Sequence, residues 1–570
     1  MGAMATQPFM RTLFAPAASG IPFSDRPWSK LSLIQPDMPL LSRDRIGFYE
    51  GPFAHRGGWH GRYAKLLGYN WKMMLLRLIV IGTVFVVPIA MAASVCSNLT
   101  RLIIPNTTIL GASEVPAGSF EPPGATQPVS VPGFCRVAAV SRPASDSEIH
   151  FEVWMPAAAN WNGKFEGTGN GGFSGVLSYA TMAGAVRRGY ATAGSDTGHQ
   201  ADDLTFGVGH PDKIDDWAWR AVHVMTEAAR LIVRNQYGRW PRHSYFTGCS
   251  TGGQQALTEA QRFPEDYDGI VAGDPGNNRI HLMAGAMWSL KVARPLTATK
   301  LPLIARAAMA ACDGIDGIKD GIISDPGHCA FDPGTLLCQG EDRDDCLTAA
   351  QVESVRQIYR GAKNPRTGER IFAGWPVGTE MTWTTYFVGP AEPRRNEFWK
   401  LWVFNNPAWD WQTFDFDRDL TYADTKMAVV NSVVANLEPF KARHGKLIMY
   451  HGLADGNVPA EDAIEYYEKV GRAMGGLART MDFARLFLAP GMGHCSGGVG
   501  PDAFDAVGAL DQWVEQGNAP KQIVASHISN AVTDRTRPLC PYPAVAKWNG
   551  SGSSDEAVNF TCATPPDRHH

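Results

Sequence analysis

Three residues carry the side chains of a nucleophile, a carboxylate and a base, and each stands in a short glycine-rich motif. Ser250 lies in Gly-Cys-Ser-Thr-Gly, which fits the G-x-S-x-G pattern of a serine on a sharp turn between a strand and a helix. Asp455 follows in Gly-Leu-Ala-Asp-Gly, and His494 in Gly-Met-Gly-His-Cys. Histidine can take the serine proton near neutral pH, and a carboxylate on the far ring nitrogen fixes its tautomer. Any one motif also fits an ordinary loop, but the set in this order predicts nucleophilic acyl transfer.

Acyl transfer also requires hydrogen-bond donors for the negative oxygen that develops on the attacked carbonyl. The backbone N–H of Thr251, the first residue of the helix expected after Ser250, is one candidate donor. The second donor is expected on a loop after an earlier strand, and the glycine-rich residues 167–172 offer Gly171 or Gly172. A plain hairpin turn is the alternative interpretation of that glycine loop.

A cysteine stands beside both the serine and the histidine. Cys249 precedes Ser250, and Cys495 follows His494. If the serine and the imidazole are in hydrogen-bond contact, their chain neighbours lie close enough for a disulfide, which needs Cα atoms within about 7 Å. We therefore expect a Cys249–Cys495 bridge that fastens the two turns together. Two unrelated core thiols are the alternative.

A second chemical feature is the aspartate- and glycine-rich stretch between Cys312 and Cys329. Carboxylates spaced in this way can wrap a hard cation, and oxygen-only ligands favour Ca²⁺. The candidate ligands are the side chains of Asp313, Asp316 and Asp320 and the backbone carbonyls of Ile318 and Ile322. The spacing differs from that of an EF-hand, and metal-free Asp-Gly turns are the alternative. The two cysteines are expected to close the loop, and the ion is expected to be structural.

Strand-like and helix-like stretches alternate around these motifs. Residues 147–156 alternate apolar and polar side chains as a half-buried strand does, and residues 215–238 have the pattern of a long helix. The other strands are expected within 163–172, 189–199, 243–250, 267–275, 445–455 and 484–498, and the other helices within 252–264 and 459–474. This alternation predicts an α/β fold with a doubly wound, mostly parallel sheet. The chain order Ser, Asp, His is that of the α/β-hydrolases.

The alternation stops between about residues 277 and 440, where the sequence is rich in Trp, Pro and Cys. We interpret 277–440 as an inserted lid domain that contains the calcium site. Residues 93–276 and 441–570 are then the two parts of an α/β-hydrolase catalytic domain.

The composition is that of a globular protein. Of the 570 residues, 44% are hydrophobic and 19% charged, with a net charge of -4. No long basic run appears, which argues against a nucleic-acid partner.

The ten cysteines all lie beyond residue 95, which suggests disulfides in an oxidising compartment. Just before them, residues 73–92 combine flanking positive charge, a short apolar stretch and an Ala-Met-Ala site, as a signal peptide does. A retained anchor is the alternative, and residues 1–72 are an unassigned leader or a mis-called start. We expect an exported, periplasmic or secreted protein with no stable membrane span in its mature form. The sequence leaves the oligomeric state open.

The motifs Gly-Cys-Ser-Thr-Gly-Gly, His-Gly-Leu-Ala-Asp-Gly and Gly-Met-Gly-His-Cys-Ser-Gly-Gly resemble the tannase and feruloyl esterase family. The resemblance runs from about Cys96 to Cys562. It implies an α/β-hydrolase core, a lid over the active site and a Ca²⁺ ion in the lid. It also implies the disulfides Cys96–Cys135, Cys249–Cys495, Cys312–Cys329, Cys338–Cys346 and Cys540–Cys562. Substrates in the family are esters of aromatic acids.

The resemblance also suggests substrate contacts. Family members that cleave terephthalate monoesters place an arginine on the free carboxylate, and Arg395 and Phe398 are expected to correspond to that arginine and a nearby phenylalanine. The chain departs from those members at Thr251, where they have an acidic residue, and at Val458, where they have an aromatic one. Trp383 is a further candidate for the pocket wall. A solvated surface arginine and packing within the lid core are the alternatives for Arg395 and Trp383.

Together these features predict an exported serine esterase for feruloyl, galloyl or terephthaloyl monoester substrates, working through an acyl-enzyme. The expected partner is a small aromatic ester, and the expected cofactor is structural Ca²⁺. A secreted serine peptidase of the same fold is one alternative, but no propeller-like repeat supports it. A non-catalytic secreted binding protein is another, and the intact set of Ser, Asp and His argues against it.

Overall fold

The computed structural model describes residues 95–125, 127–200 and 203–565. The chain divides into two units, Met1–Val87 and Pro88–His570, and all described residues belong to the second. The predicted leader, 1–72, and the predicted signal peptide, 73–92, lie outside the described residues.

A nine-stranded sheet forms the centre of the second unit, in the order β1-β4-β5-β7-β6-β8-β9-β10-β11. Its strands are β1 (Thr107–Val115), β4 (Phe134–Ser141), β5 (Ile149–Pro156), β6 (Lys164–Thr168), β7 (Ala191–Ser195), β8 (His243–Cys249), β9 (Gly269–Gly273), β10 (Lys446–Gly452) and β11 (Ala484–Ala489). Neighbouring strands from β7 to β11 are parallel, and β1, β4 and β5 add antiparallel pairs. The predicted α/β fold with a mostly parallel sheet is confirmed.

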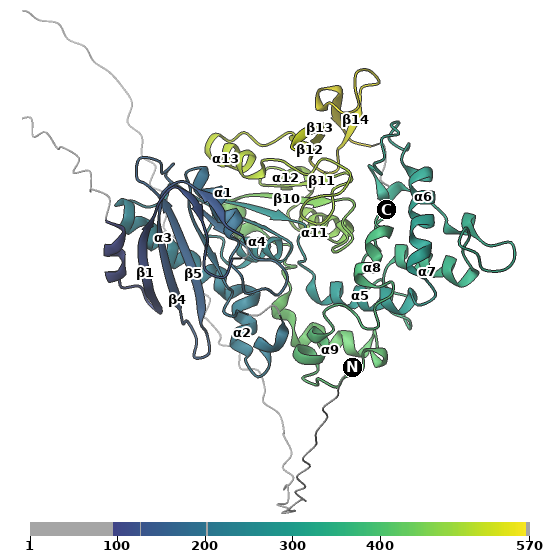
Figure 1. The fold of residues 1–570 in the computed structure, drawn as a ribbon, viewed down its shortest axis with the longest axis horizontal. Helices are drawn as coiled ribbons and strands as arrows, with labels where there is room; N and C mark the ends of the chain where they lie inside the picture. The colour runs from purple at the N-terminus through teal and green to yellow at the C-terminus, as the bar shows by residue number, and fades with distance from the viewer. Residues whose placement is uncertain (1–94, 126, 201–202, 566–570) are drawn as a thin grey trace, which may run out of the picture. The chain divides into compact units, whose positions relative to one another are not determined.

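The sheet has helices on both faces because its strands are apolar on both sides. The α-helices outside 277–437 in the described residues are α1 (Tyr179–Arg187), α2 (Pro211–Asp215), α3 (Ala221–Tyr237), α4 (Thr251–Arg262), α10 (Glu438–Ala442), α11 (Ala460–Ala473), α12 (Leu477–Thr480) and α13 (Ala506–Gln516). Ile270 and Leu447 join a core cluster with α3, α4 and α11, whereas their chain neighbours Val271 and Ile448 join a cluster with α13. Figure 1 shows α13 and α11 on opposite sides of β10.

The long helix expected over 215–238 is built from three consecutive pieces. Helix α2 begins at Pro211, whose fixed φ suits a first helical position, and a π-helical turn, Asp216–Arg220, joins it to α3. Gly238 directly follows the last residue of α3 and stops the helix by adopting a left-handed φ of 71°. Neither α3 nor any other helix in the described part of the chain is long and apolar enough to cross a bilayer.

The segment 277–440 contributes no strand to this sheet among the described residues. Apart from the start of α10, the α-helices described in this segment are α5 (Arg279–Val292), α6 (Leu301–Cys312), α7 (Ala349–Arg360), α8 (Trp383–Tyr386) and α9 (Arg418–Lys426), which are teal to green in Figure 1. They bury an aromatic-rich cluster that contains Trp375, Trp399 and Trp402 together with Phe173 and Trp217. Because Phe173 and Trp217 precede this segment in the chain, the cluster joins it to the loop after β6 and to the turn before α3.

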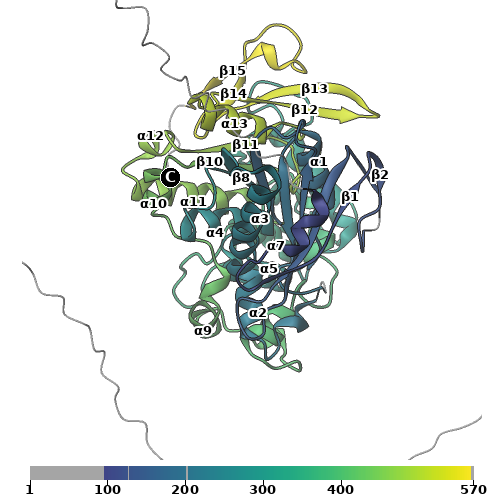
Figure 2. The same cartoon turned by 90° about the vertical axis from the view of Figure 1, so that its left-hand side faces the viewer.

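Three two-stranded sheets complete the fold. They pair β2 (Gly118–Phe120) with β3 (Val129–Val131), β12 (Ile523–Ser529) with β13 (Val532–Leu539), and β14 (Val545–Trp548) with β15 (Phe560–Ala563). Figure 2 shows the last four strands, in yellow, gathered beside α13. Arg537 of β13 donates from Nη2 to Oδ2 of Asp320 at 2.8 Å, so the C-terminal strands contact the predicted calcium loop.

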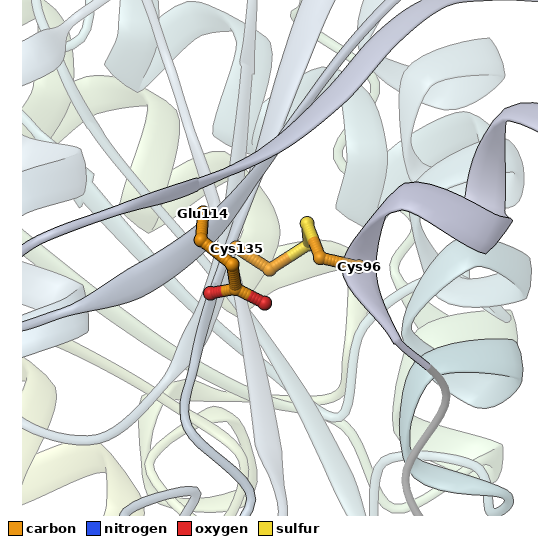
Figure 3. Close-up of side chains that lie close together, drawn as sticks. All are labelled: Cys96, Glu114 and Cys135. Carbon is orange, nitrogen blue, oxygen red and sulfur yellow. A yellow bond between two sulfur atoms is a disulfide. The ribbon is translucent and has the colours of Figure 1, made fainter.

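All ten cysteines are in disulfides: Cys96–Cys135, Cys249–Cys495, Cys312–Cys329, Cys338–Cys346 and Cys540–Cys562. These are the same five pairs that the family resemblance implies. Figure 3 shows Glu114 of β1 beside the first of these bridges. Because both sulfur atoms are in the bridge, neither is a thiolate that could join Glu114 in binding a metal.

Candidate active site

Ser250 stands at the sharp turn between β8 and α4 with φ 64° and ψ -118°, a strained conformation for a residue with a side chain. Its N–H donates to the Gly273 carbonyl at 2.9 Å, which ties the turn to the end of β9. The motif glycines allow close approach. A Cβ on Gly248 would come within 2.5 Å of the Gly252 backbone, and a Cβ on Gly252 would lie 3.0 Å from the Asn170 carbonyl. The turn, α4 and the loop after β6 therefore pack directly against one another.

Asp455 and His494 form a hydrogen-bonded pair at the ends of neighbouring strands. Nδ1 of His494 lies 2.7 Å from Oδ2 of Asp455. The other carboxylate oxygen accepts the N–H groups of Asn457 and Val458 at 2.7 and 2.9 Å. Burial raises the pKa of Asp455, but hydrogen bonds from His451 and His494 outweigh it and hold that pKa below its usual value. Asp455 is therefore an anion that fixes the His494 ring and leaves Nε2 available.

The Cys249–Cys495 disulfide joins the serine turn to the histidine loop, with Cα atoms 5.9 Å apart. Ser250 and His494 are the direct chain neighbours of the two bridged cysteines, so their turns lie side by side. Within the described residues, Ser250 Oγ makes no hydrogen bond to His494. Such contacts are often long without substrate and shorten when substrate binds.

Three backbone N–H groups beside Ser250 are candidate oxyanion donors. Thr251 is the first residue of α4, so its N–H has no partner within the helix. The N–H groups of Gly171 and Gly172 donate to no described residue. Thr251 Oγ1 donates to the Gly172 carbonyl at 2.8 Å, which holds the loop against the helix. The Asn170 N–H is already used by Gln255 Oε1 at 3.0 Å.

Two fully buried residues behind Asp455 were missed by the sequence analysis. Nε2 of His451 in β10 lies 3.3 Å from Oδ2 of Asp455 and 3.7 Å from Oδ1 of Asp274, and donates to the Val458 carbonyl at 2.8 Å. Asp274, just after β9, accepts the Gly452 N–H at 2.9 Å. The sequence could have predicted their closeness to Asp455. Both lie near the carboxyl ends of expected parallel strands, and such ends meet at one edge of a sheet.

Arg279, the first residue of α5, was also missed. Only 1% of it is exposed, and its Nε and Nη2 donate to Gln254 Oε1 at 3.1 and 2.6 Å. Nη2 also donates to Thr251 Oγ1 at 2.9 Å. Burial, with a smaller effect from Arg395, lowers the pKa of Arg279 to about 9, which leaves a cation at neutral pH. Its position in the sequence carried no signal, because an arginine that opens a helix is usually solvated.

A family model for tannase and feruloyl esterase matches residues 135–563. The chain belongs to the tannase and feruloyl esterase family. It is a carboxylic ester hydrolase. The cysteines next to Ser250 and His494, which carried the resemblance in the sequence, lie inside the matched residues.

Relatives of the esterase cover most of its length. An uncharacterised esterase of Xanthomonas campestris pv. campestris is 40% identical over 558 residues, spanning 88% of this chain and 96% of the relative. The mono(2-hydroxyethyl) terephthalate hydrolase of Piscinibacter sakaiensis is 34% identical over 546 residues, spanning 80% and 88%. The crystal structure of feruloyl esterase B from Aspergillus oryzae matches with a TM-score of 0.78 at 29% identity, covering 82% of this chain and 99% of that one. The α/β-hydrolase fold of the esterase is thereby confirmed.

The predicted substrate contacts of the esterase fall into two groups. The side chains of one group pack inside the aromatic cluster with at most 1% of each residue exposed: Trp383, Phe398 and Val458. Arg395 instead lies beside the glycine loop. Its Nη2 is 3.8 Å from the position that a Cβ of Gly172 would take, and its guanidinium lies 5.8 Å from the Phe173 ring. As substrate contacts, all four residues remain predictions.

The predicted calcium loop of the esterase turns around its three aspartates. One carboxylate oxygen of each accepts backbone N–H groups of the loop, at 2.9 to 3.1 Å. Four oxygens accept no hydrogen bond from a described residue: Oδ2 of Asp313 and Asp316, and the carbonyls of Ile318 and Ile322. These four oxygens fit Ca²⁺, whereas Oδ2 of Asp320 accepts from Nη2 of Arg537 at 2.8 Å. The three aspartates do not form a group in which one carboxylate oxygen from each lies within 4.8 Å of the others. For all three to bind one ion, their side chains must therefore rotate toward it.

Asp274→Asn is expected to change how the stability of the esterase depends on pH. Burial raises the pKa of Asp274 to about 7, whereas an unfolded Asp titrates near 3.9. Between these values the folded protein keeps a proton that the unfolded chain has lost. Its stability therefore falls as pH rises, by up to about 1.4 kcal/mol per pH unit. The asparagine variant lacks this loss, so its stability relative to wild type should increase from about pH 5 to about pH 7. Urea unfolding at both pH values measures the difference, and a constant difference would contradict the assignment.

Proposed function

We propose that the esterase is exported and hydrolyses esters of aromatic carboxylic acids, with Ser250, His494 and Asp455 as its catalytic triad. The observation that carries this proposal is the 2.7 Å contact between His494 Nδ1 and Asp455 Oδ2, on a loop bridged to the serine turn. The strained serine turn and three unused backbone N–H groups beside it give further support.

In the first half of the reaction, Ser250 Oγ attacks the ester carbonyl carbon while Nε2 of His494 takes the hydroxyl proton. The carbonyl π electrons move to oxygen, and that oxyanion accepts hydrogen bonds from the N–H groups of Thr251 and of Gly171 or Gly172. When the carbonyl re-forms, the bond to the alcohol oxygen breaks. His494 gives its proton to that oxygen, which leaves an acyl-serine and a free alcohol.

In the second half, water attacks the acyl carbon as His494 takes one of its protons. The same N–H groups bind the second oxyanion. Collapse breaks the bond to Ser250 Oγ, and His494 returns the proton to the serine. The aromatic acid leaves, and Asp455 stabilises the His494 imidazolium in both halves without itself being protonated.

One side chain beside the glycine loop and the names of the relatives support esters of aromatic acids as substrates. Arg395 places a cation beside the same loop, which favours an acid with a second, anionic group such as a terephthalate monoester. Relatives named as feruloyl esterase and as terephthalate monoester hydrolase support the two acyl classes.

The disulfides support export. All ten cysteines are paired, and structural disulfides persist in oxidising compartments rather than in a reducing cytosol. We infer a periplasmic or secreted location, reached through the apolar segment 73–92 acting as a signal peptide.

We also infer that the lid segment binds Ca²⁺ through Asp313, Asp316, Asp320 and the carbonyls of Ile318 and Ile322. The ion would hold the loop in shape and take no part in the reaction. At an ion concentration of about 100 times Kd, binding adds about 2.7 kcal/mol to stability. Chelation is therefore expected to lower Tm by a few °C, and Asp316→Asn should abolish that calcium-dependent shift. Asp325→Asn, which changes a carboxylate paired with His328 in the same loop, is the matched control. An equal Tm with and without the chelator would remove the ion from the proposal.

A fluorophosphonate probe tests the triad, because it reacts with an activated serine. We expect wild type to be labelled and Ser250→Ala to be unlabelled. Hydrolysis of methyl gallate, methyl ferulate and mono(2-hydroxyethyl) terephthalate, assayed side by side, then separates the acyl classes. Cleavage of a peptide substrate alone would favour the peptidase alternative, and no labelling of wild type would favour the binding protein.

A further inference from the structure

We propose that Arg279 is a positioning residue of the esterase reaction. It acts through Thr251 to hold the oxyanion donors in place, and it supplies positive charge for the transition state. This inference rests on the serine mechanism proposed above and extends it to a residue outside the triad and the backbone donors.

The hydrogen bonds from Arg279 run in one direction only. A guanidinium donates and cannot accept, so Thr251 Oγ1 accepts from Arg279 Nη2 at 2.9 Å. The hydroxyl proton of Thr251 must then point elsewhere, and it meets the Gly172 carbonyl at 2.8 Å. The side chain of Thr251 thus joins the two backbone segments whose N–H groups are the candidate oxyanion donors. By donating to Thr251 Oγ1, Arg279 directs the hydroxyl proton of Thr251 toward the Gly172 carbonyl.

The charge of Arg279 is not neutralised by an acid in the described residues. Its other acceptor is the neutral amide oxygen Oε1 of Gln254, at 2.6 and 3.1 Å. Nε2 of Gln254 donates to the Val430 carbonyl at 2.7 Å, which keeps the amide oxygen turned toward the guanidinium. A buried charge acts strongly on its neighbours because the local dielectric is low. The oxyanion of the tetrahedral intermediate therefore gains more from this cation than the neutral ester does, which lowers the barrier.

The glycine loop does not depend on Arg279 alone for its shape. The Phe173 ring stacks on Trp217 with centroids 4.7 Å apart, and Nε2 of His199 donates to the Phe173 carbonyl at 2.6 Å. The guanidinium of Arg395 lies over the same ring. The Arg279 guanidinium also lies 5.6 Å from the Phe173 ring and from the Trp217 ring. A methionine at position 279 keeps an apolar contact with these rings while it removes the charge. Arg279→Met should therefore alter the chemical step more than the fold.

Four single variants and one double variant test the inference. Arg279→Met removes the charge, Thr251→Val removes the hydroxyl at nearly constant volume, and Thr251→Ser keeps the hydroxyl. Arg262→Met is the matched control, because it removes an exposed arginine from α4, the helix that begins at Thr251. The double variant Arg279→Met/Thr251→Val reports whether the two residues act through one connection.

We expect kcat for methyl ferulate to fall about 10- to 100-fold in Arg279→Met and about 10-fold in Thr251→Val, less than the ~10²- to 10³-fold loss of a direct oxyanion donor. Thr251→Ser should recover most of the loss, Arg262→Met should stay within about twofold, and the double variant should be no worse than Arg279→Met. Phenylboronic acid, which forms a negative tetrahedral adduct with a serine, should bind at least 10-fold more weakly to Arg279→Met. Binding of the neutral ground-state analogue ferulamide should change by less than about threefold.

Equal weakening of both inhibitors, or multiplicative losses in the double variant, would make the role of Arg279 structural and overturn the inference. So would a kcat of Arg279→Met or Thr251→Val within about twofold of wild type. Thr251→Val keeps the outcome decisive if Arg279→Met fails to fold. If Ser250→Ala retains hydrolysis, the serine mechanism itself fails. If Ser250→Ala is inactive while Arg279→Met and Thr251→Val are both fully active, only the present inference fails.

Discussion

Asp455→Asn is expected to lower kcat of the esterase by about 10³- to 10⁴-fold, with little change in KM. The carboxylate accepts a hydrogen bond from Nδ1 of His494 at 2.7 Å, which leaves Nε2 unprotonated and able to take the Ser250 proton. An asparagine amide donating to Nδ1 reverses this arrangement and places the ring proton on Nε2. The ring then has no base to offer the serine. Steady-state hydrolysis of methyl ferulate measures the loss.

The fold should survive Asp455→Asn because the side chain keeps its volume and its acceptor for the N–H groups of Asn457 and Val458. Asp266→Asn is the matched control. Asp266 is a buried carboxyl group before the start of β9, and its Oδ2 lies 2.6 Å from Nδ1 of His223, so it forms a similar pair away from Ser250. We expect its kcat to stay within about twofold of wild type. If Asp455→Asn retained a tenth of wild-type kcat, Asp455 would not be what orients the base.

Replacing both cysteines of the Cys249–Cys495 bridge with alanine is expected to reduce stability and activity together. The bridge closes a separation of 246 residues, for which the chain-entropy model gives about 5.5 kcal/mol as an upper bound. That value is comparable to the whole stability of many domains. The bridge also holds the turns of Ser250 and His494 side by side, so kcat should fall at least about 10-fold in the protein that remains folded. Urea unfolding and active-site titration with a fluorophosphonate measure the two effects.

The Cys338–Cys346 pair is the matched control for that experiment. It spans only 8 residues in the segment 277–440, and the same model gives about 2.5 kcal/mol. Replacing it with alanines should lower stability without changing kcat per titrated site. Wild-type kcat in the Cys249–Cys495 double alanine variant would mean that the loops hold the triad without the bridge.

Most of the sheet and the proximity of Ser250, Asp455 and His494 could be predicted from the sequence. The strands at 446–452 and 484–489 lie within the expected segments, because parallel strands buried on both faces produce strong apolar runs between glycines. The contact between Asp455 and His494 followed from their positions just after such strands. The paired cysteines carried the family resemblance, since each stands next to a residue of the proposed triad.

The residues around the proposed triad could not be predicted, because their contacts depend on packing between distant segments. Arg279 meets Thr251 only when the start of α5 reaches the start of α4, and nothing in its local sequence separates it from a surface arginine. Trp383 and Phe398 are aromatic in sequence, as a pocket wall would be, yet both are 0% exposed in the aromatic cluster. Residue type alone does not distinguish the wall of a substrate pocket from a buried hydrophobic core, because both favour large apolar rings.

The Cys249–Cys495 disulfide has a further consequence for proteolysis of this esterase. It links the chain before residue 277 to the chain after residue 440. A protease that cuts the chain once within that segment leaves both parts covalently joined, with Ser250 still next to His494. Such nicked molecules migrate as one species without a reducing agent and as two with one. A single cut within 277–440 therefore does not by itself separate Ser250 from His494.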